Sequence, residues 1–183
     1  MHTKRDANLF GALSLAVADV IRTSAEQESD LDGSSQAALV AISTFLEGGT
    51  IAQLSRLTGL THSATVRLVD RLVNQGLIER GPGADRRAVA LRPTRRGRAV
   101  GKGILGARER ALGGILDRLP GSEGERLTPL LEELLAALVR RDGDPFRICR
   151  MCDARACGHY DGRCPVTETS RGLASASLPP LGE

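Results

Sequence analysis

Aromatic residues are scarce in this chain of 183 residues. It has three Phe, one Tyr and no Trp. A hydrophobic core must therefore be built from Leu, Ala, Val and Ile, which suits packed helices better than a β-sandwich. A chain of this length buries one good core and is a poor candidate for two full domains. The composition predicts a mainly α-helical protein.

Long apolar runs and a signal peptide are also missing. No apolar stretch has the length of a membrane span, and the N-terminal stretch MHTKRDANLF is polar. We therefore expect a cytoplasmic protein with no membrane partner. The only histidines are His2, His62 and His159, and no HExxH, GxSxG or phosphate-loop motif occurs. The sequence predicts that the protein is not an enzyme.

Apolar residues recur at helical spacing along most of the chain. The predicted helices are 8–26, 35–46, 51–58, 61–76, 94–119 and 122–141. Ser122 and Glu125 are spaced as a capping box for the last helix. Alternation within 77–80 and 88–91, around a turn-rich GPGAD, predicts a β-hairpin. The expected domains are 1–34 (N-terminal dimerisation helix), 35–97 (winged helix-turn-helix), 98–144 (C-terminal dimerisation helices), 145–168 (four-cysteine extension) and 169–183 (disordered tail).

The two short helices joined at Gly59, followed at once by a basic hairpin, indicate a winged helix-turn-helix. Short polar side chains at the N-terminal end of the second helix can bond to base edges, and a Val methyl group can contact thymine. The residues of this helix expected to contact DNA are Thr61, His62, Ser63, Thr65, Val66 and Arg67.

The hairpin region is rich in arginine. Between Glu79 and Arg98 lie seven Arg against two acidic residues. Such a run is often only a solvated face, but its place after a helix-turn-helix favours DNA contact. We expect Arg86 and Arg87 at the hairpin tip to bind DNA, since arginine at such a tip can enter a minor groove.

The segment from Ile51 to Gly97 resembles the signature of the MarR family of transcriptional regulators. The resemblance rests on LVDRL, GLIER, the Asp85-Arg86-Arg87 run, and then Leu91, Thr94 and Gly97. It extends in element order over about residues 8–141. It implies a homodimer, with interlocking first and last helices, on a pseudo-palindromic operator in double-stranded DNA. It also implies that Asp85 braces the wing and that Arg87 reaches the minor groove.

Two features depart from the family pattern. Pro93 lacks an N–H donor and is expected to shorten or bend the second wing strand. The glycine-rich helix 94–119 is expected to loosen the hinge to the DNA-binding lobe. The apolar faces of the first and last helices agree with a dimer, because one small domain cannot cover them.

All four cysteines lie in one short C-terminal stretch with the spacing C-x2-C-x4-C-x6-C: Cys149, Cys152, Cys157 and Cys164. In a reducing compartment this clustering favours metal or redox chemistry over structural disulfides. Four thiolates suit zinc, our first choice, or alternatively an iron–sulfur cluster. Free thiols and a thiol switch are further alternatives. The neighbouring Arg147, Arg150, Arg155 and Arg163 would favour thiolates.

These patterns predict a dimeric, sequence-specific DNA-binding repressor whose four-cysteine site senses metal or redox state. An alternative is a repressor that responds to a small-molecule effector, with purely structural cysteines. Its cleft would be lined by Leu13, Val17, Leu39 and Ile42. A third alternative is an interaction module that keeps the fold without binding DNA.

Overall fold

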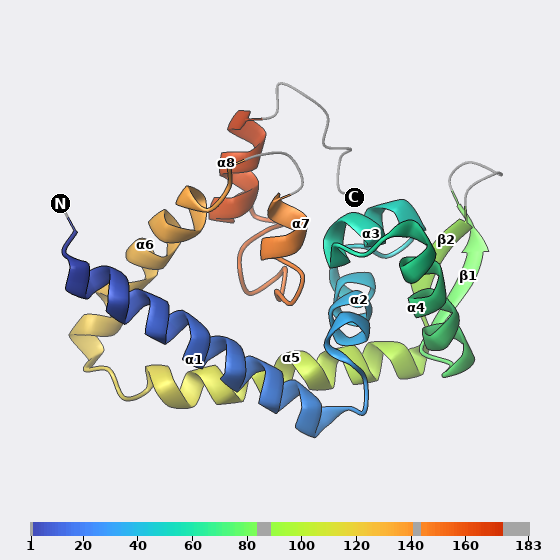
Figure 1. Ribbon diagram of the computed structural model, residues 1–183, viewed down its shortest axis with the longest axis horizontal. Helices are drawn as coiled ribbons and strands as arrows, with labels where there is room; N and C mark the ends of the chain where they lie inside the picture. The colour runs from blue at the N-terminus through green and yellow to red at the C-terminus, as the bar shows by residue number, and fades with distance from the viewer. Residues whose placement is uncertain (1, 84–88, 141–143, 174–183) are drawn as a thin grey trace.

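The computed structural model describes residues 2–83, 89–140 and 144–173 (Figure 1). In chain order the elements are α1 (Lys4–Glu28), α2 (Gly33–Thr44), α3 (Ile51–Thr58), α4 (His62–Asn74), β1 (Ile78–Pro82), β2 (Val89–Pro93), α5 (Arg95–Leu116), α6 (Gly121–Ala137), α7 (Asp144–Ile148) and α8 (Pro165–Leu173). The strands β1 and β2 pair antiparallel. The predicted mainly helical, winged helix-turn-helix fold is confirmed.

Local side-chain chemistry sets the helix-turn-helix. Thr50 and Gln53 form a reciprocal capping box that begins α3, and the Thr61 hydroxyl accepts the N–H of Ala64 to begin α4. Between the two helices Gly59 has φ 71°, a left-handed conformation that is costly for residues with a Cβ. The sharp joint predicted at this glycine is therefore present.

The core of the DNA-binding lobe surrounds α2, which is buried along most of its length. Leucines of α3 and α4 and the inner residues of the wing complete it, without Trp and with Phe146 as its one fully packed aromatic ring among the described residues. Its central members are Leu39, Ile42, Leu54, Leu57, Leu68, Leu72, Ile78 and Leu91. A smaller cluster, made by Ala25, Val40 and Ile104, joins α1, α2 and α5.

In the N-terminal half of α5, the glycines allow neighbouring elements to pack closely against the helix and do not loosen it. A Cβ on Gly97 would overlap the carbonyl group of Leu77. A Cβ on Gly101 would lie 3.0 Å from the Ser43 hydroxyl of α2. Thr94, at the N-cap of α5, donates from its hydroxyl to the Gly76 carbonyl at 2.7 Å. These contacts fix α5 to the end of α4 and the start of the wing.

Three sequence expectations need correction. First, α6 begins at Gly121 with Pro120 at the N-cap and no side-chain cap, so the capping box at Ser122 and Glu125 was wrong. Second, β2 extends to Pro93, which pairs with Ile78, so the strand ends two residues later than the predicted 88–91, at the proline itself.

The third correction concerns the C-terminal tail. Residues 169–173 belong to α8, so the tail predicted to be disordered from residue 169 is helical over these positions. The remainder of that predicted tail, 174–183, lies outside the described residues. The helix forms because it packs on α6 and α7, which the sequence did not indicate.

The molecule has a lobe at one end and a helical arm, made of α1, α5 and α6, that leads away from it (Figure 1). The helices α2–α4 and the wing form the DNA-binding lobe at one end. Helices α1 and α5 pack side by side and lead away from it, and α6 stands at the other end. Between α6 and the lobe lie α7, the cysteine loop and α8. Within the parts of the chain that are described, no helix has the length and apolarity needed to cross a membrane.

Candidate nucleic-acid interface and four-cysteine pocket

The N-terminal half of α4 presents most of the predicted DNA-contacting residues on one surface. Thr61, His62, Ser63 and Arg67 are exposed, and Val66 is half-buried. This surface combines a helix N-terminus with short polar groups and one arginine. Such a set can accept a phosphate and bond to base edges.

The prediction that Thr65 contacts DNA was wrong. Its side chain is fully buried, and its hydroxyl donates to the Thr61 carbonyl at 2.9 Å. Position 65 lies three and four residues before Leu68 and Val69, so it falls on the inward arc of the helix. Leu68 and Val69, on the same arc, are also fully buried.

The hairpin tip that carries Asp85, Arg86 and Arg87 lies outside the described residues, so their wing roles stay predictions. Arginines on the hairpin flanks brace the wing. Arg80 pairs with Asp70 of α4 at 2.7 Å. Further along, Arg92 donates to the Pro82 carbonyl and Arg96 to that of Gln75.

A two-point ion pair fixes α5 to the loop after α2. Both terminal nitrogens of Arg98 donate to the Glu47 carboxylate at 2.8 Å. These hydrogen bonds hold the pKa of the Glu47 carboxyl below its usual value. The described arginines Arg80, Arg92, Arg96 and Arg98 therefore make structural contacts.

The four cysteines converge on one pocket beside the DNA-binding lobe. All four line it, together with Phe45, Phe146 and His159. All four are free thiols. Cys149 interacts most strongly with Cys164, and Cys152 interacts with Cys157, as the effects of these thiols on each other's pKa show. The thiols of Cys152 and Cys157 also donate to the carbonyls of Asp153 and Ala154, at 3.7 and 3.4 Å. The chain has therefore brought the two ends of the motif together, as a shared site requires.

The four cysteines differ in pKa. A hydrogen bond from Cys149 lowers the pKa of Cys164 to about 4, and N–H groups at the start of α8 add to the effect. The same hydrogen bond, followed by burial, raises the pKa of Cys149. Burial raises the pKa of Cys157 to about 12. These interactions favour the thiolate form at Cys164, just before α8, over the thiolate forms of the other three cysteines.

Arg108 of α5 is a site residue that the sequence did not reveal. Its Nε is buried and has no hydrogen-bond partner. Burial raises the pKa of Cys152, and the nearby guanidinium of Arg108 opposes that effect. The cation lies far from the cysteines along the chain, so only the tertiary fold brings it to them. No local pattern marks it.

Two of the four arginines expected to favour thiolates make other contacts. Arg150 donates to the Arg147 carbonyl, and Arg163 pairs with Asp161 at 3.0 Å. A guanidinium that is already paired offers less stabilisation to a thiolate. Arg108 is therefore the better candidate for this role.

Four cysteines lining one pocket are a donor set suited to zinc. Across the described ranges, no three His, Cys, Asp or Glu side chains are arranged as a group that could hold a metal ion. Zinc bonded to four sulfurs at about 2.3 Å needs those sulfurs roughly 3.8 Å from one another. The four thiols of the pocket would have to take up that spacing around a bound metal.

The histidine and tyrosine of the loop make separate contacts. His159 Nδ1 lies 2.9 Å from the Thr167 hydroxyl, so this ring is held against α8. The Tyr160 hydroxyl donates to the Thr44 carbonyl at the end of α2, at 2.8 Å. The loop is thus fastened to the lobe by a hydrogen bond.

A model of the MarR family matches residues 29–88, which run from the end of α1 into the hairpin. The winged helix-turn-helix segment is thus similar to that of the MarR family. Members of the family are transcription regulators rather than enzymes, in agreement with the prediction of no enzymatic activity. No curated relative matches the chain.

Several solved structures share this fold, among them a MarR family protein. A MarR family protein from Bacillus stearothermophilus is 22% identical with a TM-score of 0.64, over 76% of this chain and 100% of that one. RV1404 from Mycobacterium tuberculosis is 26% identical with a TM-score of 0.63, over 73% and 93%. A MepR variant of Staphylococcus aureus bound to an oligodeoxyribonucleotide is 19% identical with a TM-score of 0.54, over 75% and 99%. Each of these structures covers about three quarters of this chain.

Proposed function

We propose that the protein is a homodimeric, cytoplasmic transcriptional repressor that binds a pseudo-palindromic operator in double-stranded DNA. The observation that carries this proposal is the exposed N-terminal half of α4, with Thr61, Ser63 and Arg67 presented beside a basic wing. The MepR neighbour bound to an oligodeoxyribonucleotide supports the same use of the fold. In such folds this helix enters the major groove.

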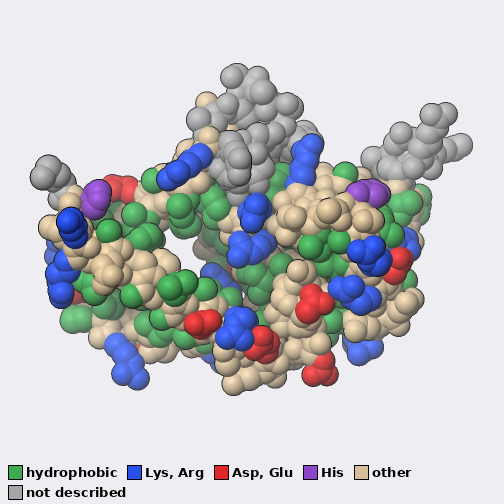
Figure 2. Space-filling model, in the orientation of Figure 1, with side chains coloured by type: hydrophobic (Ala, Val, Ile, Leu, Met, Phe, Trp, Pro, Cys, Tyr) green, Lys and Arg blue, Asp and Glu red, His purple; other side chains and the backbone are tan. Residues whose placement is uncertain are grey.

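The second copy in this proposal covers apolar faces that the chain leaves open. Within the described chain α6 packs mainly on α8, and its leucines are exposed. Figure 2 shows hydrophobic side chains at the surface of this arm. The exposed apolar residues of α1 are Leu9, Phe10, Leu13 and Leu15. Those of α6 are Leu130, Leu131, Leu134 and Leu135, and Leu138 follows directly after the helix. Apolar faces of this extent are typical of an interface between copies.

DNA binding is tested by selecting operators from a pool of random duplexes and measuring affinity by fluorescence anisotropy. We expect affinity to fall steeply with salt, because phosphate contacts release counterions. Arg67→Ala should weaken binding roughly 5- to 150-fold, if a base contact contributes about 1–3 kcal/mol. Arg118→Ala, an exposed arginine beyond α5, is the matched control and should have no effect. If the protein binds no duplex even at low salt, the remaining candidate is an interaction module that keeps the fold without binding DNA.

We further propose that the four-cysteine pocket binds zinc, with an iron–sulfur cluster as the alternative, and that it senses metal or redox state. Three features support this: the shared pocket, the Cys164 thiolate, and the unpartnered Nε of Arg108 beside it. A cation beside a four-thiolate site offsets its negative charge.

Metal analysis and a visible absorption spectrum of protein purified without air test this part. Colourless protein with about one zinc per chain supports the first choice, and brown protein with iron and sulfide supports the alternative. The control is the variant with all four cysteines changed to Ser, which should hold neither. Wild-type protein without either metal would overturn the proposal.

A second candidate function is response to a small molecule, and a cavity of about 690 Å³ favours it. The cavity is lined by α1, α2, Arg108, Leu135 and the cysteine segment, and Figure 2 shows the surface hollowed there. The expected lining was wrong, since Leu39 and Ile42 are fully buried in the core. Induction that persists in the four-serine variant would favour this candidate over metal sensing.

A further inference from the structure

We propose that Phe146 and Met151 couple the four-cysteine pocket to the DNA-binding lobe, so that a metal bound by the thiols changes DNA affinity through these two side chains. This inference rests on the proposed function, because it needs both DNA binding and metal binding. It adds the physical connection between the two.

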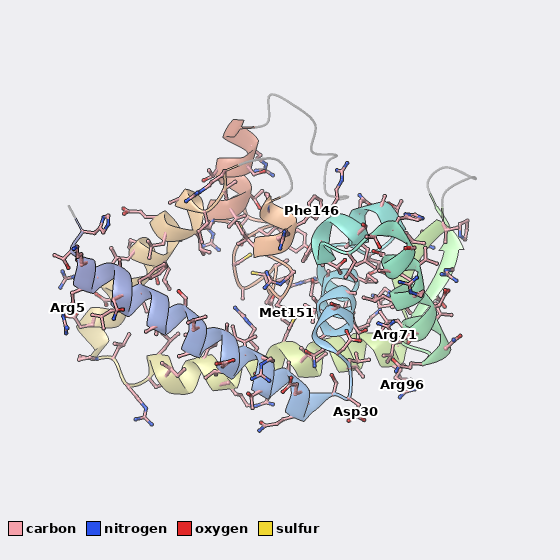
Figure 3. All side chains as sticks on the ribbon, in the orientation of Figure 1. Arg5, Asp30, Arg71, Arg96, Phe146 and Met151 are labelled. Atoms are coloured by element: carbon pink, nitrogen blue, oxygen red, sulfur yellow. The ribbon has the colours of Figure 1, made fainter. Side chains whose placement is uncertain are left out.

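Phe146 forms part of the wall between the pocket and the lobe. Its ring lines the thiol pocket and also belongs to the core cluster of the lobe, with only 6% of its surface exposed. It lies on α7, which packs against α3, the first helix of the helix-turn-helix (Figure 3). Since Cys149 follows three residues later, movement of that thiol will displace the ring.

Met151 makes a second connection from within the motif itself. It stands between Cys149 and Cys152, the two thiols that a tight turn offers to one metal. Its side chain packs against both the core of the lobe and the cluster where α1, α2 and α5 meet (Figure 3). Closing the two thiols on a metal fixes the backbone on both sides of this methionine. The direction of its side chain is then set by the metal.

The other side of the pocket is fastened to the dimerisation arm. Val139, just after α6, packs with Cys164 and Val166 in a small buried cluster. The cysteine segment therefore contacts α6 on one side and the lobe on the other. A rigid, metal-bound segment will hold the lobe at one orientation to the arm, whereas thiols without metal allow another. In a dimer this orientation sets the separation of the two α4 helices, and hence the fit to successive major grooves.

The experiment compares DNA affinity of the full-length protein with zinc and after removal of zinc by a chelator under reducing conditions. The probe is the duplex selected with the zinc-loaded protein. We expect the dissociation constant of the wild type to change by about 5- to 150-fold between the two states, the usual range of coupling between sites. Met151→Ala and Phe146→Ala should keep about one zinc per chain and lose most of this change. Arg171→Ala, on the exposed side of α8, is the control and should keep it.

Each remaining outcome counts against the inference. Equal affinity of wild type in both states would overturn it while leaving DNA binding intact. The full wild-type change in both variants would overturn the role of these residues. If Phe146→Ala does not fold, Phe146→Leu and Met151→Ala carry the test, with Leu expected to restore part of the change. Failure of wild type to bind any selected duplex would overturn the proposed function itself, and this inference with it.

Discussion

Replacement of Gly97 by Ala tests the contact that fixes the wing to α5. The added methyl group would overlap the Leu77 carbonyl and come within 2.8 Å of its carbon. Because the obstacle is backbone, relief requires α5 or the wing to shift, and we place the cost at about 3 kcal/mol. Alanine regains about 1 kcal/mol of helix propensity. The net loss of about 2 kcal/mol should lower Tm by about 4–8 °C for a chain of this size.

The assay is thermal unfolding followed by circular dichroism at one fixed chain concentration, because a dimer's Tm depends on concentration. Gly114→Ala is the matched control, since this glycine lies in the same helix and a Cβ there meets nothing within 4 Å. It should raise Tm by about 1–4 °C through helix propensity. A Gly97→Ala variant as stable as wild type would refute the close approach of α5 to the wing.

Three shorter predictions follow from other contacts. Glu47→Gln should cost about 0.2–1 kcal/mol at neutral pH. In unfolding curves this difference should shrink as the pH falls below the carboxyl's ordinary pKa and vanish only below its folded pKa, because the hydrogen bonds from Arg98 lower the folded pKa and the stabilisation is lost as the carboxyl protonates. Leu131→Glu should give a monomer in light scattering, since it places a charge on the exposed apolar face of α6, and a persistent dimer would refute that interface. Arg108→Gln should weaken zinc binding about 10- to 100-fold in a chelator competition, and unchanged affinity would remove this arginine from the site.

Local patterns predicted the helix-turn-helix well. The bounds of α3 and the joint at Gly59 follow from capping residues and a left-handed glycine, which act within a few residues. The error at Thr65 was of a different kind, because the polarity of its hydroxyl suggested a surface position. A hydrogen bond to the preceding turn satisfies that hydroxyl, so the side chain can be buried on the inward arc.

Long-range contacts could not be predicted from the sequence. The spacing of the cysteines indicated a shared site, and the structure groups them in one pocket. The role of Arg108 depends on how α5 passes that pocket, and nothing near it in the chain signals this. Likewise α8 is short and polar, and its helical state depends on packing against α6 and α7.

The scarcity of aromatic residues gives this protein a built-in optical reporter. With no Trp and a single tyrosine, its near-ultraviolet emission comes almost entirely from Tyr160. That ring donates a hydrogen bond to the Thr44 carbonyl, at the seam between the cysteine loop and α2. Its fluorescence will therefore report whether the loop is seated on the lobe. Docking and release can be timed in a stopped-flow instrument on unlabelled protein, without altering a single residue.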